Sequence, residues 1–321
     1  MFTRFLGFRK GISGGRPDVE RAIARRDLKG LARALQSPEG SVREAAARGL
    51  GQVGGVGVME HLIATLQDPD WRVRVVAARQ IGALVEGTVP DNPTGDDTLI
   101  LAAAEPLILV LQQDDEWRVR TAAAEALGSM GKVLANGERW AQVDEALLLA
   151  LRDEKWAVRR AASGSLTQMG DQALESLLAA LQDPLWCVRE GAARTLGQIG
   201  SLPSESASRG RLVRLLASTL QDPDPRVRHA GSKALGRIAI GPDEAELHGL
   251  AVESLVIALQ GDERRVREAA AEALGLLADA RAVEPLLTAM QDESESVQRA
   301  ASKALDRLAK AQGIHTGPTV G

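Results

Sequence analysis

The chain is poor in aromatic residues and in cysteine. Its 321 residues include five Trp, three Phe and no Tyr, and Cys187 is the single cysteine. One cysteine cannot form an intrachain disulfide and excludes CxxC metal or redox motifs, so we expect Cys187 to be a small packing residue. With so few rings, a hydrophobic core must be built from Ala, Leu, Val and Ile. Such a core depends on close approach of the backbone rather than on bulky side chains.

The chain also lacks a charge imbalance and any catalytic motif. Its 39 Lys and Arg against 43 Asp and Glu give a net charge of −4, whereas a general polyanion binder has a clear basic excess. The sequence contains no P-loop, no glycine-rich nucleotide fingerprint, no nucleophile elbow and no metal-ligand spacing. We therefore predict no catalytic residue, no cofactor and no metal site, and nucleic acid is not the expected partner.

One sequence unit is repeated along the chain. The segment LQDPDWRVRVVAARQIG at residues 66–82 occurs in recognisable form eight times, at intervals of 30 to 46 residues. The aligned valines are Val42, Val73, Val119, Val158, Val188, Val227, Val266 and Val297. An apolar run precedes each valine and an Ala-rich segment follows it, which predicts a helix A, a tight turn and a helix B.

Single positions of the unit predict its local structure. In the fifth copy Leu174, Leu177, Leu178 and Leu181 form one apolar stripe on helix A. Asp68, Asp183 and Asp222 are placed for hydrogen bonds in the turn between the helices. A glycine after the last Leu or Ile, as at Gly197, Gly236 and Gly275, predicts a left-handed end of helix B.

These patterns predict an all-α fold, an α-solenoid of about eight stacked helical hairpins. We expect one solenoid domain over residues 28–310, an N-terminal capping segment at 1–27 and a flexible tail at 311–321. The first segment carries Phe2, Phe5 and Phe8 among basic residues, and it is too short for a membrane span. Its alternative role is contact with a membrane surface. The expected localisation is cytoplasmic.

The repeated unit resembles a known family of repeats. Leu-Gln-Asp-Pro-Asp-Trp-Arg-Val-Arg, followed by x-x-Ala-Ala-x-x-Ile/Leu-Gly, is similar to the HEAT-like repeats named after phycobilisome lyases, and the similarity covers about residues 28–310. The resemblance implies a solenoid whose concave wall is formed by helix B and binds a partner. Because fold does not imply function, the family name gives only an alternative, a lyase-type or chaperone-like subunit that handles a chromophore on a client protein.

The positions that vary between copies are the candidates for binding. Two columns on helix B, two and six residues after the motif valine, form the predicted partner-binding strip. Its members are Arg48, Val75, Arg79, Thr121, Glu125, Arg160, Glu190, Arg194, His229, Lys233, Glu268 and Glu272. The mixed charge, with a basic cluster at Arg79, Arg160 and Arg194, suits a protein or peptide of patterned charge better than a phosphate backbone.

Other repeated positions are interpreted as structural. Trp71, Trp117, Trp156 and Trp186 occupy one motif position, and we expect each ring to pack at the turn and on the neighbouring repeat. The alternative is an aromatic strip for a tetrapyrrole, a base or a partner. The motif Asp and Arg, as in Asp68 with Arg74 and Asp183 with Arg189, are expected to form ion pairs within one unit or between adjacent units.

Two features outside the motif are further candidate contacts. Trp140 lies in an insertion and is predicted to be exposed, and the insertion at 86–97 is long and acidic. Taken together, the sequence predicts a non-catalytic scaffold that binds a protein partner through the concave helix B surface. The alternatives are the chromophore-handling subunit and a nucleic-acid-binding solenoid similar to alkylpurine glycosylases, which would need a basic groove with aromatic residues.

Overall fold

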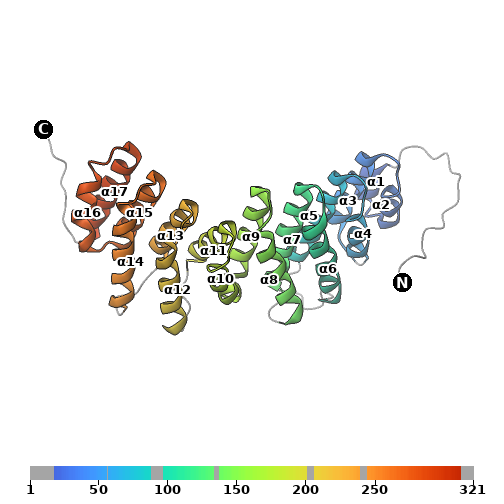
Figure 1. Ribbon diagram of the computed structural model, residues 1–321. Coiled ribbons are helices and arrows are strands. Elements are labelled where there is room, and N and C mark those ends of the chain that lie inside the picture. The colour runs from blue at the N-terminus through green and yellow to red at the C-terminus, as the bar shows by residue number, and fades with distance from the viewer. Residues whose placement is uncertain are drawn as a thin grey trace. The chain divides into compact units, whose positions relative to one another are not determined.

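The computed structural model describes residues 18–55, 57–87, 97–133, 137–200, 206–238 and 244–311 (Figure 1). Within these ranges every regular element is a helix, so the fold is an α-solenoid, as the repeats predict. Most of the predicted capping segment, the tail from residue 312 onward and most of the 86–97 insertion lie outside the described residues. The chain forms two compact units, Met1–Pro106 and Leu107–Gly321. One continuous domain over 28–310 stays a prediction.

The first unit consists of helical hairpins built on the motif. Its helices are α1 (Val19–Ala24), α2 (Leu28–Ala34), α3 (Gly40–Val53), α4 (Val58–Thr65), α5 (Trp71–Gly87) and the start of α6 (Asp97–Gln113). Helix α2 packs on α3, α4 packs on α5, and α3 and α5 pack on each other. The short α1 covers α3, where Ile23 lies against Gly49. The described part of the predicted N-terminal cap therefore packs on the first hairpin.

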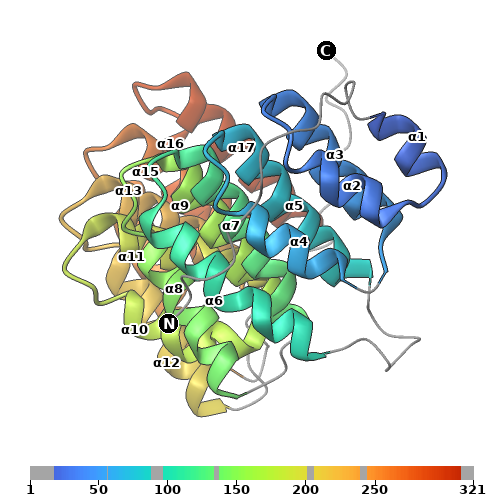
Figure 2. The same cartoon turned by 90° about the vertical axis from the view of Figure 1, so that its right-hand side faces the viewer.

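The second unit arranges its helices in two layers (Figure 2). The A layer contains α8 (Glu138–Ala150), α10 (Leu174–Ala180), α12 (Ser206–Thr219), α14 (Ala245–Leu259) and α16 (Val283–Ala289). The B layer contains α7 (Trp117–Val133), α9 (Trp156–Met169), α11 (Trp186–Ile199), α13 (Pro225–Arg237), α15 (Arg264–Leu277) and α17 (Glu295–Ala311). Neighbouring B-layer helices pack on each other more extensively than neighbouring A-layer helices do.

The core between the layers is built from aliphatic side chains, as the shortage of aromatic residues requires. Leu177 and Leu178 of α10 are fully buried and Leu181 is nearly so, which confirms most of the predicted stripe on helix A. Each motif valine is buried as well, and burial of such side chains contributes roughly 1.5–3 kcal/mol apiece. This core holds the layers together and leaves the outward-facing residues of helix B free to vary.

The prediction that the motif glycines end helix B is wrong. Gly197, Gly236 and Gly275 lie inside their helices and have no left-handed backbone. A Cβ at Gly236 would lie 2.6 Å from Cα of Ala273, and a Cβ at Gly275 would lie 2.7 Å from Cα of the corresponding Ala on the next B helix. The glycines are therefore needed for close helix packing. This close approach explains how a core of small side chains can be dense.

The motif aspartates shape the turn between helix A and helix B, as predicted. The carboxylates of Asp68, Asp183 and Asp222 each accept a hydrogen bond at 2.9 Å from the backbone N–H two residues later. This local bond orders the turn that precedes helix B. It also holds the second carboxylate oxygen toward the neighbouring repeat, where it can receive an arginine.

A candidate partner-binding groove

In several repeats the motif arginine forms a connection to the following repeat. In Arg189, Nη1 donates to the backbone oxygen of Asp183 in its own repeat at 2.8 Å. Its Nε and Nη2 donate to the carboxylate of Asp222 in the next repeat at 2.6 and 2.9 Å. The same two-oxygen contact joins Arg43 to Asp68, Arg120 to Asp153 and Arg267 to Asp292. We call each such contact a rung; its two parallel bonds fix the geometry of both partners.

The rungs correct the pairs predicted from sequence spacing. Toward the aspartates six positions earlier, Asp68 and Asp183, Arg74 and Arg189 donate to the backbone oxygens. The carboxylate of Asp68 instead binds Arg43, and its pKa is lowered because the hydrogen bonds and charges outweigh the opposing effect of burial. Spacing along the chain could not distinguish the two partners, because both lie at the same turn.

One rung differs at the fourth repeat. Arg159 keeps the bonds to the backbone oxygens of Asp153 and Glu154, at 2.8 and 3.2 Å. Among the described residues it forms no ion pair with Asp183, whose carboxylate accepts a bond from Arg152 at 2.7 Å. Arg152 stands where other copies of the motif have Gln. The Nε of Arg159 is buried, and no hydrogen-bond acceptor for it lies in the described ranges.

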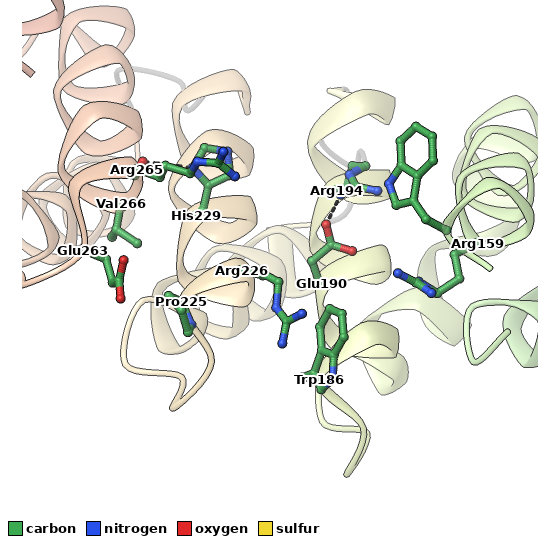
Figure 3. A pocket seen from close by; sticks show the side chains of 11 residues that line it. Arg159, Trp186, Glu190, Arg194, Pro225, Arg226, His229, Glu263, Arg265 and Val266 are labelled. Atoms are coloured by element: carbon green, nitrogen blue, oxygen red, sulfur yellow. Dashed lines mark hydrogen bonds and ion pairs between the residues drawn. The ribbon is translucent and has the colours of Figure 1, made fainter. Parts of the chain in front are cut away.

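A groove of about 650 Å³ lies beside this altered rung, along the first turns of α9, α11, α13 and α15 (Figure 3). Helices α9 and α11 pack less extensively on each other than the other neighbouring B-layer helices do, which leaves this space. The groove is lined by Trp156, Arg159, Trp186, Arg194, Arg226 and His229, among others. It will be called the tryptophan groove.

Guanidinium groups and indole rings meet in the tryptophan groove. Arg226 lies over the ring of Trp186 with its Cζ 3.3 Å from the ring centroid, and Arg159 lies at 5.7 Å from the same centroid. Figure 3 shows these two arginines reaching toward Trp186 from different helices. Arg160 lies 5.4 Å from the ring centroid of Trp156. Such cation–π contacts hold the charges beside an apolar surface.

The charges in the groove are mainly positive. Arg194 pairs with Glu190 one turn earlier on α11, and its pKa is lowered by burial and by the nearby charges of Arg159 and Arg160. Nδ1 of His229 donates a hydrogen bond at 2.9 Å to the backbone oxygen of Arg265, and burial lowers the pKa of His229. A histidine of lowered pKa is neutral at pH 7, so arginines supply the positive charge.

A second, smaller groove lies farther along the B layer. It has a volume of about 250 Å³ and is lined by Lys233, Arg237, Glu272, Lys303 and Arg307, together with Leu276, which is 51% exposed. Four of these six side chains are cationic, although the whole chain has a net charge of −4. Positive charge is therefore concentrated on the B layer of the second unit.

Family comparison agrees with this arrangement of repeats. The model of the HEAT repeats matches residues 28–100, 59–136, 144–209 and 252–315, and a single HEAT repeat matches residues 212–241. The chain belongs to the HEAT-repeat family. The narrower phycobilisome-lyase class, which the motif resembles, is not among the matched models. No curated protein sequence matches the chain.

Solved HEAT-type structures have the same fold. Importin beta is similar with a TM-score of 0.66 and 19% identity over 91% of this chain and 42% of that one. Kap95p, described with RanGDP, gives 0.59 and 17% over 90% and 42%. The karyopherin Kap121p, bound to the extreme C-terminus of the protein phosphatase Cdc14p, gives 0.59 and 16% over 89% and 38%. The chain thus spans about two fifths of these proteins, and the likeness shows the fold.

The predicted strip on the HEAT B helices is not uniformly exposed. In the column six residues after the motif valine, Arg194 is half-buried, and the exposed members are Arg48, Arg79, Glu125, Lys233 and Glu272. In the column two residues after it, Arg160 is exposed, Thr121, His229 and Glu268 are half-buried, and Val75 and Glu190 are buried. Val75 is therefore a core residue. Most residues two positions after the valine are covered because they meet the start of the next B helix. Glu268, for example, accepts a hydrogen bond at 2.9 Å from the hydroxyl of Ser296 at the start of α17.

The tryptophans of the motif differ from one another. Trp71 and Trp117 are half-buried, each beneath the Arg that follows it in the chain. Trp156 is 56% exposed and lines the groove with Trp186, so the expected packing between repeats does not describe its ring. Trp140, which was expected to be exposed, is instead half-buried, and its Nε1 is enclosed. Trp140 is thus less exposed than expected, and its role as a contact stays a prediction.

Sequence reasoning did not identify Arg159 and Arg226 as candidate functional residues. Arg159 belongs to the conserved pattern of the motif within the chain, and Arg226 lies outside both columns of the strip. One signal was present: the fourth copy has Arg152 at the motif position where the other copies have Gln. Only the contact between Arg152 and Asp183 shows what that replacement does.

In the described ranges, no group of His, Cys, Asp or Glu is arranged to hold a metal ion. None of the helices in the part of the chain that the structure describes is both long and apolar enough to span a bilayer.

Proposed function

We propose that this HEAT-repeat protein is a scaffold that binds a protein partner on the B layer of its second unit. The observation that carries the proposal is that both grooves lie on this layer. They are lined by five residues of the predicted strip, namely Glu190, Arg194, His229, Lys233 and Glu272. Grooves with apolar walls and a few charged groups are typical of binding sites.

The packing of the layers supports the same surface. Neighbouring B helices approach closely through their glycines, while A helices contact each other less. Closer packing on one side bends a stack of repeats toward that side, so we expect the B layer to be concave. A concave wall places side chains from successive repeats around one bound segment. The karyopherin Kap121p, a protein of similar fold, is described bound to the C-terminus of another protein.

The test compares charge reversal on the two layers. The B-layer variant carries Arg160→Glu and Lys233→Glu, both at exposed positions, and the matched A-layer variant carries Arg211→Glu and Arg214→Glu on α12. Each variant changes the net charge by the same amount. Tagged proteins are used for affinity capture from the source cells, with quantitative mass spectrometry of the proteins retained, and thermal unfolding checks the fold.

We expect a partner that is retained by the wild type and the A-layer variant and lost with the B-layer variant. Loss with both variants would indicate a general charge effect, and retention by both would contradict the proposal. Arg194 is kept unchanged in this design because it is half-buried beside Glu190. Reversal of its charge would place two carboxylates one turn apart and destabilise α11.

The chromophore-handling role remains the alternative suggested by the resemblance to phycobilisome-lyase repeats. It predicts that a bilin added to the purified protein changes its absorption spectrum, and an unchanged spectrum would exclude it. Binding of duplex DNA, the other alternative, predicts affinity that falls steeply with salt concentration. Both measurements use the same preparation as the capture experiment.

A further inference from the structure

The altered rung at Arg159 leaves a carboxylate-binding group in the tryptophan groove. At the four complete rungs, Nε and Nη2 of the motif arginine bind both oxygens of an Asp from the next repeat. At Arg159 the corresponding Asp183 is held by Arg152 instead. Arg159 therefore lacks the carboxylate that the motif arginine binds at the complete rungs. Its Nε is buried, and the guanidinium lines the groove.

The environment of Arg159 distinguishes it from the other arginine without a complete rung. Arg228 also makes only the backbone contacts, to Asp222 and Pro223 at 2.8 and 3.1 Å. It lines a different groove, which contains the carboxyl groups of Asp262 and Glu263. Arg159 lies instead beside Arg194 and under Trp186, and its buried Nε has no acceptor in the described ranges.

We propose that the tryptophan groove binds an extended acidic peptide segment of the partner. One carboxylate of the peptide binds the part of the Arg159 guanidinium that lines the groove, in place of the Asp that the next repeat supplies at the complete rungs. The exposed ring of Trp156 covers an apolar side chain two residues away in the peptide, and Arg226 and Arg194 attract the remaining negative charge of the peptide. This inference rests on the proposed function, since it names the chemistry of the partner for that surface.

The charge pattern favours an acidic peptide over a nucleic acid. Arg159, Arg194, Arg226 and Arg265 line the groove, and two acids, Glu190 and Glu263, line it as well. A peptide can offer backbone N–H groups to these acids, whereas an unbroken phosphate backbone would be repelled by them. A bidentate arginine also suits a carboxylate, and the rungs show that this position of the motif already selects one.

The size of the groove sets the length of the peptide. Packed helices are about 8–10 Å apart, so the first turns of four successive B helices extend over roughly 30 Å. An extended chain rises about 3.4 Å per residue, which corresponds to about nine residues. Side chains that alternate in direction would place every second residue toward the groove.

The test uses a fluorescein-labelled peptide of nine residues whose groove-facing positions, every second residue, are alternately Glu and Leu or Phe, with Ser at the positions between them. Binding is measured by fluorescence anisotropy with the full chain, and a peptide with Gln in place of Glu is the ligand control. The variants are Arg159→Gln, Trp156→Ala and, as the matched protein control, Arg228→Gln. Gln is suitable because Gln298 occupies the motif position in the last repeat and donates to the backbone oxygen of Asp292 at 2.6 Å.

We expect saturable binding of the Glu peptide, weakened at least tenfold by Arg159→Gln and severalfold by Trp156→Ala. Arg228→Gln should change the affinity less than twofold, although it loses the same kind of backbone contact. The Gln peptide should bind at least tenfold more weakly than the Glu peptide. Circular dichroism and thermal unfolding of each variant separate loss of binding from loss of fold.

Three outcomes would overturn the inference. They are no saturable binding of the Glu peptide, equal weakening by Arg159→Gln and Arg228→Gln, and tighter binding of an oligothymidylate than of the peptide. The proposed function is judged separately by the capture experiment. If the B-layer reversal still abolishes capture while the Glu peptide does not bind, the scaffold proposal stands and the acidic-peptide inference fails.

Discussion

Replacement of Arg267 by Gln separates the two halves of a rung. Nε and Nη2 of Arg267 hold Asp292 at 2.7 and 3.0 Å, and Nη1 donates to the backbone oxygens of Gly261 and Asp262 at 3.0 and 2.8 Å. The two side chains of the ion pair are 9% and 11% exposed. Since Gln298 makes the backbone contact in the last repeat, Arg267→Gln should keep one such bond and lose the carboxylate.

The expected loss lies between those of exposed and buried ion pairs. Exposed pairs contribute about 0–1 kcal/mol, whereas removal of one partner from a fully buried pair costs roughly 3–5 kcal/mol. Asp292 keeps the hydrogen bond from the N–H of Ser294 at 2.8 Å after the change. We therefore expect Arg267→Gln to destabilise by about 2–3 kcal/mol. Arg228→Gln loses no carboxylate and should cost about 1 kcal/mol or less.

The rung also predicts a dependence on pH. The pKa of Asp292 is lowered, chiefly by the hydrogen bond from Arg267, with burial opposing the change. A carboxyl group whose pKa is lower in the folded state stabilises the fold fully above its unfolded value of about 3.9. That contribution disappears as the pH falls through the lowered folded value. The difference between wild type and Arg267→Gln should therefore be largest near neutral pH and shrink below about pH 4.

Hydrogen exchange is the appropriate assay, because each repeat of a solenoid contacts only its neighbours and can open separately. Loss of the rung should increase exchange in α16 and α17, which follow the Arg267 repeat, more than in α9 and α11. Urea unfolding gives the total loss. Equal destabilisation by Arg267→Gln and Arg228→Gln, or a difference that does not change with pH, would refute the stabilising role of the carboxylate.

Three further substitutions test the core and the layer contacts. Asp144 is buried, and burial raises its pKa to about 6, with partial compensation by a hydrogen bond from Ser176. Relative to the ordinary pKa of 3.8, this shift corresponds to a destabilisation of about 3 kcal/mol by the ionised carboxyl. Solvent relaxation reduces that destabilisation to about 1–2 kcal/mol. Because the pKa is raised in the folded state, ionisation of Asp144 increasingly destabilises the fold as the pH rises from 4 to 6. Asp144→Asn should therefore stabilise the protein at pH 7 but not below pH 4. Urea unfolding across that pH range measures the difference. Gly236→Ala places a Cβ 2.6 Å from Cα of Ala273 and should destabilise the fold by about 1–3 kcal/mol. Gly164→Ala in α9 places its Cβ with no packing neighbour within 4 Å among the described residues and should stabilise the fold by about 0.5–1 kcal/mol. Thermal unfolding that ranks the two glycine variants alike would contradict the packing argument.

The repeat architecture could be predicted because the same residues recur at fixed positions. Apolar residues at helical spacing, such as Leu177 and Leu178, become buried whenever two helices pair, so their periodicity is sufficient evidence. The turn aspartates are equally predictable, since their hydrogen bond to the N–H two residues later is local. The family matches and the all-helical structure agree with these predictions.

Contacts between repeats could not be predicted in the same way. The motif glycines have the composition of helix ends, but they lie inside helices because the neighbouring backbone passes within contact distance. Arg189 has two acceptors in reach, and only the stacking of repeats decides that Asp222 takes the carboxylate contact. The exposure of Val75 and Trp140 likewise depends on which helix lies beside them, which spacing along the chain does not state.

The sequence by itself determined the repeated helical hairpin and the composition of its core. These follow from periodicities within one repeat and from the shortage of large side chains. Tertiary structure alone decided that Arg159, among the described residues, lacks the carboxylate contact of a rung and that Trp156 stays exposed. Both depend on the fit between adjacent repeats. There the carboxylate of Asp183 binds Arg152 instead of Arg159, and a groove lies along α9 and α11.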